Sequence, residues 1–228
     1  MKNAIPNIFT ILNLLSGFLG ITFLLNSNYN LLEYCIYFSL LFDFLDGFLA
    51  KKLNAISNFG KQLDSFSDLI SFGALPSLIL YDWFLNNSSV EIYKYFPIII
   101  LVFSSFRLSK FNLDKKQKFV FSGLPTPVVA LFFNSLIFNS DDVYSFVNQE
   151  ILLFLILFFS FLMIVKVKFI SLKFKNYSLK ENLDKYILLF VSIILFSTLR
   201  LQSFPIIVFI YIIISFSFSR FNIRSLKQ

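Results

Sequence analysis

The sequence contains no histidine and only one cysteine, Cys35, in 228 residues. Because histidine is the usual proton carrier near neutral pH and zinc sites are built from cysteine and histidine, imidazole catalysis and Cys/His zinc sites are excluded. One cysteine cannot form an intramolecular disulfide, and Cys35 lies in an apolar run that indicates a packing role. Any general base must therefore be a carboxylate, a lysine or a tyrosine.

Charged residues are also scarce, at 14% of the chain, whereas 57% of the residues are hydrophobic and 20% are aromatic. The mean hydropathy is +0.76. These values exclude a soluble domain and indicate an integral membrane protein. The segment before the first apolar run is too short and too weakly charged for a secretory signal, so we expect this run to be a retained helix.

Most of the apolar runs are close to the roughly 20 residues that a helix needs to cross a bilayer. They predict an all-α, polytopic membrane bundle of about eight transmembrane helices that forms one catalytic domain over residues 1–228. Its core helices lie within about 8–168, and two further helices follow within about 185–220. The predicted helices are 8–25, 31–52, 60–81, 97–110, 122–139, 150–168, 185–200 and 204–220.

Basic residues gather in alternate loops of this predicted topology. If both termini are cytoplasmic, nearly all of the 20 lysines and arginines lie on the cytoplasmic side, and Lys94 and Arg200 are the exceptions. This asymmetry predicts cytoplasmic N- and C-termini in the cell membrane. The net charge of +7 is then a belt that faces anionic lipid headgroups, so the bilayer is the expected partner and nucleic acid is not.

Four aspartates interrupt the apolar sequence. Asp43 and Asp46 are three residues apart, and Asp64 and Asp68 are four apart, so each pair shares one face of its predicted helix. The polar stretch 51–58 is suited to a turn between antiparallel helices. We therefore expect the four carboxylates to meet at the cytoplasmic edge of the bundle.

Like charges in a poorly solvated place either protonate or recruit cations. Oxygen ligands favour Mg²⁺, Mn²⁺ or Ca²⁺, and two such ions would balance four carboxylates and leave coordination positions for a diphosphate. The simpler interpretation is that aspartates at helix ends pair with Lys51, Lys52 and Lys61.

The residues between 43 and 68 read D-x2-D-G-x2-A-K-x8-G-x3-D-x3-D. This pattern resembles the signature of the CDP-alcohol phosphatidyltransferase family, membrane enzymes that move a phosphatidyl group from CDP-diacylglycerol to an alcohol. Lys51 stands where the family usually has arginine, so it keeps the charge and loses the bidentate fork. The matching positions are Asp43, Asp46, Gly47, Ala50, Gly60, Asp64 and Asp68.

The resemblance implies a role for each of these positions. Two Mg²⁺ or Mn²⁺ ions, or Ca²⁺, would be held by the four aspartates, and Asp68 would be the general base. CDP-diacylglycerol would contact Asn7, Thr10, Asp43, Gly47, Ala50, Lys51 and Gly60. Asn7 and Thr10 are equally suited to cap the first helix. The resemblance also implies a possible homodimer.

Two further stretches resemble the phosphatidylserine synthase branch of that family. They are residues 5–17, and F-R-L-S-K-F-N at 106–112 with the later F-S-G-L-P-T-P-V-V-A at 121–130. The substrates implied are CDP-diacylglycerol and serine, and the products phosphatidylserine and CMP. Arg107 and Lys110, three residues apart, would bind the acceptor's carboxylate. Alternatively, both side chains extend to the lipid headgroups.

Two other functions remain open on the sequence. Glycerol 3-phosphate or inositol phosphate could replace serine, although a phosphate-bearing acceptor calls for a more basic pocket than Arg107 and Lys110 provide. Membrane aspartates also occur in cation and proton transporters. A transporter typically has polar residues near mid-membrane and an internal repeat, whereas these aspartates cluster at one edge.

Overall fold

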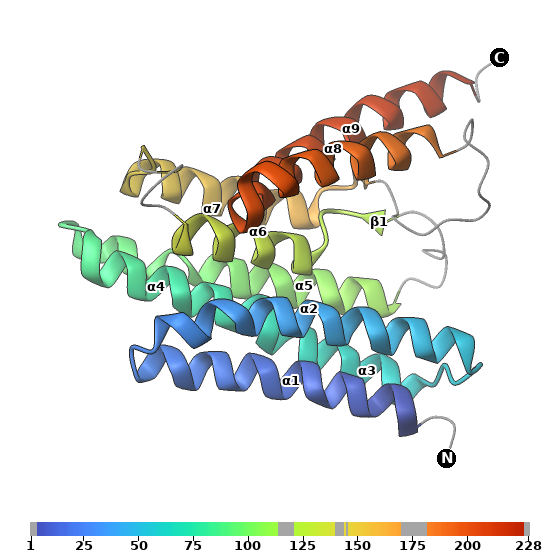
Figure 1. Cartoon of the computed structure of the whole chain (residues 1–228), viewed down its shortest axis with the longest axis horizontal. Coiled ribbons are helices and arrows are strands. Elements are labelled where there is room, and N and C mark those ends of the chain that lie inside the picture. The colour runs from blue at the N-terminus through green and yellow to red at the C-terminus, as the bar shows by residue number, and fades with distance from the viewer. Residues whose placement is uncertain (1–3, 114–120, 140–143, 145, 170–181, 226–228) are drawn as a thin grey trace.

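The computed structural model describes residues 4–113, 121–139, 144, 146–169 and 182–225 (Figure 1). The predicted helical architecture is confirmed, with the addition of one antiparallel pair of two-residue strands. The elements are α1 (Ala4–Leu25), α2 (Tyr29–Lys52), α3 (Asn58–Asp68), the π-helix η1 (Leu69–Ala74), α4 (Leu75–Asn87), the 3-10 helix η2 (Glu91–Tyr95), α5 (Ile98–Leu113), β1 (Phe121–Ser122), α6 (Thr126–Phe138), α7 (Gln149–Ile164), β2 (Lys168–Phe169), α8 (Leu183–Leu199), the 3-10 helix η3 (Arg200–Ser203) and α9 (Phe204–Ser225).

Helices α1 and α2 form an antiparallel hairpin that packs against α3 and η1 (Figure 1). The Asn28 side chain accepts a hydrogen bond from the Leu31 backbone and so caps α2. Gly17 of α1 has no room for a side chain, because a Cβ there would overlap Ser71 of η1. This close contact fixes α1 against the segment that follows Asp68.

The helix predicted over 60–81 is one continuous rod from Asn58 to Asn87, but its middle turn is a π-helix rather than an α-helix. Pro76 has no backbone N–H, and its ring opposes an α-helical bond to the carbonyl four residues earlier. The wider turn of η1 absorbs this defect just before α4 begins.

The fifth and sixth predicted helices are shorter than the sequence indicated. Pro125 has an extended backbone and caps α6, so this helix begins at Thr126 rather than near residue 122. Gly123, at φ +86°, donates from its backbone to Val167, and Leu124 donates to Leu162 at the end of α7. The segments just before Gly123 and just after Val167 are therefore extended and pair as β1 and β2. Helix α7 accordingly ends at Ile164 rather than near residue 168.

The main hydrophobic core joins α4, α5, α6, α7, α8 and α9, and tilted and edge-on phenylalanine pairs link α6, α7 and α9. Phe132 of α6 lies 4.2 Å from Phe159 of α7 and 5.4 Å from Phe209 of α9, measured between ring centroids. Aromatic pairs in these arrangements contribute beyond their area burial. The C-terminal hairpin of α8 and α9 is thus part of the same packed unit.

By length and hydropathy, four helical stretches of the described chain can cross a membrane: Ala4–Leu25, Asn58–Asn87, Glu91–Leu113 and Leu183–Ser217. The last stretch contains α8 and most of α9. Helices α6 and α7 are apolar but shorter, and α2 carries Glu33, Asp43 and Asp46. The membrane character is confirmed, while about eight crossings and cytoplasmic termini remain predictions.

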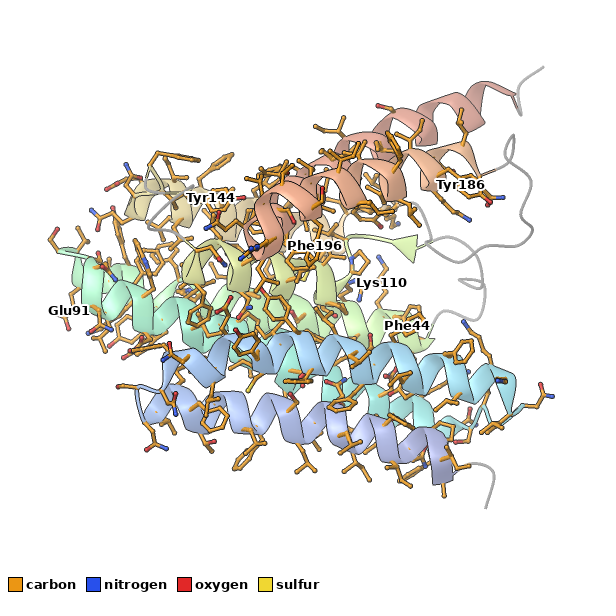
Figure 2. The ribbon with its side chains drawn as sticks, viewed as in Figure 1. Phe44, Glu91, Lys110, Tyr144, Tyr186 and Phe196 are labelled. Carbon is orange, nitrogen blue, oxygen red and sulfur yellow. The ribbon has the colours of Figure 1, made fainter. Side chains whose placement is uncertain are left out.

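The two ends of the bundle differ in charge. The start of α1, the end of α2, the start of α3 and the end of α5 lie together (Figure 1), and this end carries Lys51, Lys52, Lys61 and Lys110. The opposite end carries Glu91, whose carboxylate lies 3.0 Å from the ammonium of Lys94 (Figure 2). The acidic pairs of α2 and α3 lie within about three turns of the basic end.

Candidate active site

Three of the four predicted aspartates meet where α2 crosses α3. Asp43, Asp64 and Asp68 each offer a carboxylate oxygen, and these oxygens all lie within 4.8 Å of one another. Asp68 is buried, and the other two are half-buried. The antiparallel path of α2 and α3 produces this arrangement, because it places the part of α2 two to three turns before its end level with the last turns of α3.

Asp46 belongs to the same site but lies outside that group of three. Its side chain is 5% exposed, and its Oδ2 atom is buried without a hydrogen-bond partner in the described part of the chain. A buried, unsatisfied carboxylate oxygen is costly unless a cation or ligand completes it. Asp46 and Asp64 both line one cavity, so Asp64 links this cavity to the cluster of three carboxylates.

The cavity has a volume of about 170 Å³ and opens between the start of α1, the end of α2 and the start of α3. Gly47 leaves open space there, since no other atom lies within 4 Å of the position its Cβ would take. At Gly60 a Cβ would lie 3.2 Å from the Asn7 amide oxygen, so a side chain would crowd Asn7. The predicted nucleotide-lipid residues that line the cavity are Asn7, Thr10, Gly47, Ala50, Lys51 and Gly60.

Lys61 also lines this cavity, together with Lys51. Their two ammonium groups lie beside a space of suitable chemistry for phosphate. The alternative in which Lys51, Lys52 and Lys61 pair with the aspartates stays a prediction from the sequence.

Asn13 is a site residue that the sequence analysis missed. Its amide Nδ2 donates to the Asp68 carboxylate at 3.2 Å, and its backbone carbonyl accepts from the Ser71 hydroxyl at 2.9 Å. Asn13 is fully buried. The available signal was its spacing, because it follows Asn7 and Thr10 at intervals of three residues along α1.

The two predicted acceptor residues have different surroundings. Arg107 on α5 is buried, at 8% exposure, and it interacts electrostatically with Asp68 and Asp43. Lys110 is exposed near the end of the same helix (Figure 2). The structure therefore brings Arg107 to the carboxylates and leaves Lys110 at the surface, where contact with lipid headgroups suits it.

The donor set fits a divalent metal. Carboxylate oxygens are the ligands that Mg²⁺, Mn²⁺ and Ca²⁺ prefer, and the unsatisfied Oδ2 atom of Asp46 offers another. Three acidic oxygens within 4.8 Å repel one another strongly in a partly buried place. The site can thus hold a hard cation next to a cavity that has two lysines at its wall.

Comparison with known proteins agrees with this arrangement. A sequence model of CDP-alcohol phosphatidyltransferase matches residues 3–170. The chain belongs to the CDP-alcohol phosphatidyltransferase family. This family assignment covers every aspartate of the site and Arg107, and it leaves α8 and α9 outside the matched residues.

Several relatives of this phosphatidyltransferase are themselves named as acting on serine. The chain is 36% identical over 188 residues to the CDP-diacylglycerol–serine O-phosphatidyltransferase of Bacillus subtilis, covering 80% of this chain and 97% of that protein. The Helicobacter pylori (strain 26695) enzyme of the same name is 28% identical, over 91% of this chain and 87% of its own. The archaetidylserine synthase of Methanothermobacter thermautotrophicus is 36% identical over 58% of this chain and 57% of its own.

Proposed function

We propose that this phosphatidyltransferase transfers the phosphatidyl group of CDP-diacylglycerol to the hydroxyl of serine, giving phosphatidylserine and CMP. The observation that carries the proposal is the buried Arg107 beside the carboxylate cluster, which offers a guanidinium for the carboxylate of an amino-acid acceptor. The relatives named as serine phosphatidyltransferases support the same acceptor.

In this reaction the diphosphate of CDP-diacylglycerol lies in the cavity between α1, α2 and α3. Lys51 and Lys61 offset its charge, and Gly47 and Gly60 give it room near the backbone. The serine oxygen attacks the phosphorus that carries diacylglycerol. The bond from that phosphorus to the CMP oxygen breaks, and CMP leaves with the electron pair.

Asp68 accepts the proton of the serine hydroxyl. Its carboxylate is buried and held by Asn13, so its position is fixed before the acceptor arrives. Asp43, Asp46 and Asp64 would hold the divalent ions with help from Asp68. When bound, these ions supply the positive charge that offsets the diphosphate and the charge developing on CMP.

We also propose that the protein lies in the cell membrane or inner membrane and that its active site faces the cytoplasm. This is supported by the lysines at the same end of the bundle as the aspartates. The family also predicts a homodimer. Size-exclusion chromatography with light scattering checks this prediction.

The deciding experiment is transfer of radiolabelled serine into chloroform-soluble lipid by the purified protein in detergent. We expect labelled lipid that requires both CDP-diacylglycerol and Mg²⁺ or Mn²⁺. If glycerol 3-phosphate or inositol phosphate is incorporated and serine is not, the proposed acceptor is wrong. If no alcohol is incorporated and no CMP is released, cation transport becomes the better interpretation of the aspartates.

A further inference from the structure

Arg107 carries a polar atom that the described residues leave without a partner. Arg107 is 8% exposed. Its Nε atom is buried and donates no hydrogen bond to any acceptor in the described part of the chain. A buried guanidinium with an unused donor is costly, and a bound anion would remove that cost. Arg107 interacts with Asp68 and Asp43, and also with Tyr211 of α9.

Tyr211, which interacts electrostatically with this arginine, is held rigidly in the bundle. It is 6% exposed, and its ring stacks on that of Phe169 of β2 at 6.0 Å between centroids and 27° between planes. Phe169 is itself buried and meets Phe216 of α9 edge-on at 5.9 Å. Ser215, one turn beyond Tyr211, is fully buried and hydrogen-bonds to its side chain. The ring and the hydroxyl of Tyr211 are therefore both fixed.

The position of α9 is also set far from Arg107, at the tip of the C-terminal hairpin. There the hydroxyls of Ser135 and Tyr144 donate to backbone carbonyls of η3, at Leu201 and Gln202. Tyr144 lies beside this tip, away from Lys110 and the end of α5 (Figure 2). Two separate anchors, the tip and the ring of Phe169, thus place Tyr211 in the bundle.

We propose that Tyr211 is a positioning residue that holds the Arg107 guanidinium in the orientation that binds the acceptor's carboxylate. A phenol oxygen accepts hydrogen bonds and a guanidinium only donates them, so the two groups are complementary. Because α9 lies beyond the matched residues 3–170, the C-terminal hairpin then adds a selectivity element to the shared catalytic unit. The acceptor's identity in this inference rests on the proposed function.

The test is Tyr211→Phe, which keeps the stacked ring and removes the hydroxyl. We expect the KM for serine to rise about tenfold, with the KM for CDP-diacylglycerol and the kcat nearly unchanged. Ser215→Ala is expected to raise the KM for serine less, in the same direction. An unchanged KM for serine in Tyr211→Phe overturns the inference.

Tyr144→Phe is the matched control, because Tyr144 is also 6% exposed and its hydroxyl secures the same hairpin. It is expected to lower Tm and leave the KM for serine unchanged. If Tyr144→Phe raises that KM as much as Tyr211→Phe does, the effect is a loosened hairpin and the inference fails.

The wild-type assay separates this inference from the proposed function. If the wild type uses another alcohol, the proposed acceptor is wrong, and the same pair of variants is measured with that alcohol. A selective rise in its KM in Tyr211→Phe then supports the positioning role, and no rise refutes it. If the wild type turns over no alcohol at all, both proposals fail.

Discussion

Replacing Asp68 by asparagine should stabilise the protein when metal is removed, even though it abolishes turnover. The change removes one of three like charges and keeps the shape of the side chain, and the new amide oxygen still accepts from Asn13. Two unit charges at 4.8 Å repel by about 3.5 kcal/mol at an effective dielectric constant of about 20. Since Asp43 and Asp64 are half-exposed and a cluster without metal is partly protonated, screening and proton uptake reduce the expected gain to roughly 1–3 kcal/mol.

The assay is thermal unfolding in detergent with a chelator, followed by the fluorescence of Trp83, the only tryptophan. For a chain of this length the expected gain corresponds to a Tm rise of about 2–12 °C. Added Mg²⁺ should raise the Tm of the wild type and have little effect on Asp68→Asn, because the variant has lost a ligand.

Asp82→Asn is the control on the same helical rod, where the aspartate accepts a hydrogen bond from the Tyr29 hydroxyl at 2.9 Å. It should leave the response to Mg²⁺ unchanged. If Asp68→Asn melts below the wild type in chelator, or gains as much from Mg²⁺, then the three carboxylates do not form a strained cation site and the reasoning is refuted.

Three other outcomes follow from the geometry. Gly123→Ala should lower the free energy of unfolding by about 2 kcal/mol or more, because the φ of Gly123 is +86° and a Cβ there would overlap the Met163 carbonyl. Gly47→Ala should keep the wild-type Tm and lose affinity for CDP-diacylglycerol. Measurements of Tm and of the KM for CDP-diacylglycerol on both variants check this. Lys51→Arg should lower the KM for CDP-diacylglycerol about two- to tenfold by restoring a bidentate contact, and an unchanged KM would show that Lys51 does not touch the diphosphate. Chelation should abolish CMP release and added Mg²⁺ or Mn²⁺ should restore it, so activity that persists in chelator would remove the metal from the mechanism.

The sequence was informative wherever chemistry requires a fixed spacing along a helix. The intervals between Asp43 and Asp46 and between Asp64 and Asp68 predicted a shared site, and the structure brings three of these carboxylates together and places Asp46 at the adjoining cavity. Hydrophobic runs likewise predicted the helices, because burial in a bilayer or a core leaves a long apolar signal.

The sequence was silent wherever a property depends on contacts between distant residues. Arg107 and Lys110 look equivalent three residues apart, and only the packing of other helices around α5 buries the first and exposes the second. Asn13 offers one ordinary polar side chain in an apolar helix, and its importance comes from Asp68, which is 55 residues away. The strand pair at β1 and β2 likewise depends on Gly123 reaching the end of α7.

The π-helical turn η1 makes the type of turn after Asp68 as important as its composition. It carries the chain from Asp68 into α4 with fewer degrees of rotation per residue than an α-helix. If Leu69–Ala74 became α-helical with no change in the number of residues, α3 would rotate by about 100° relative to α4, the rotation of one α-helical residue. The rod would stay intact and apolar, yet Asp64 and Asp68 would point away from Asp43. In this family member, the angular setting of the acidic residues is thus stored in the π-helical turn.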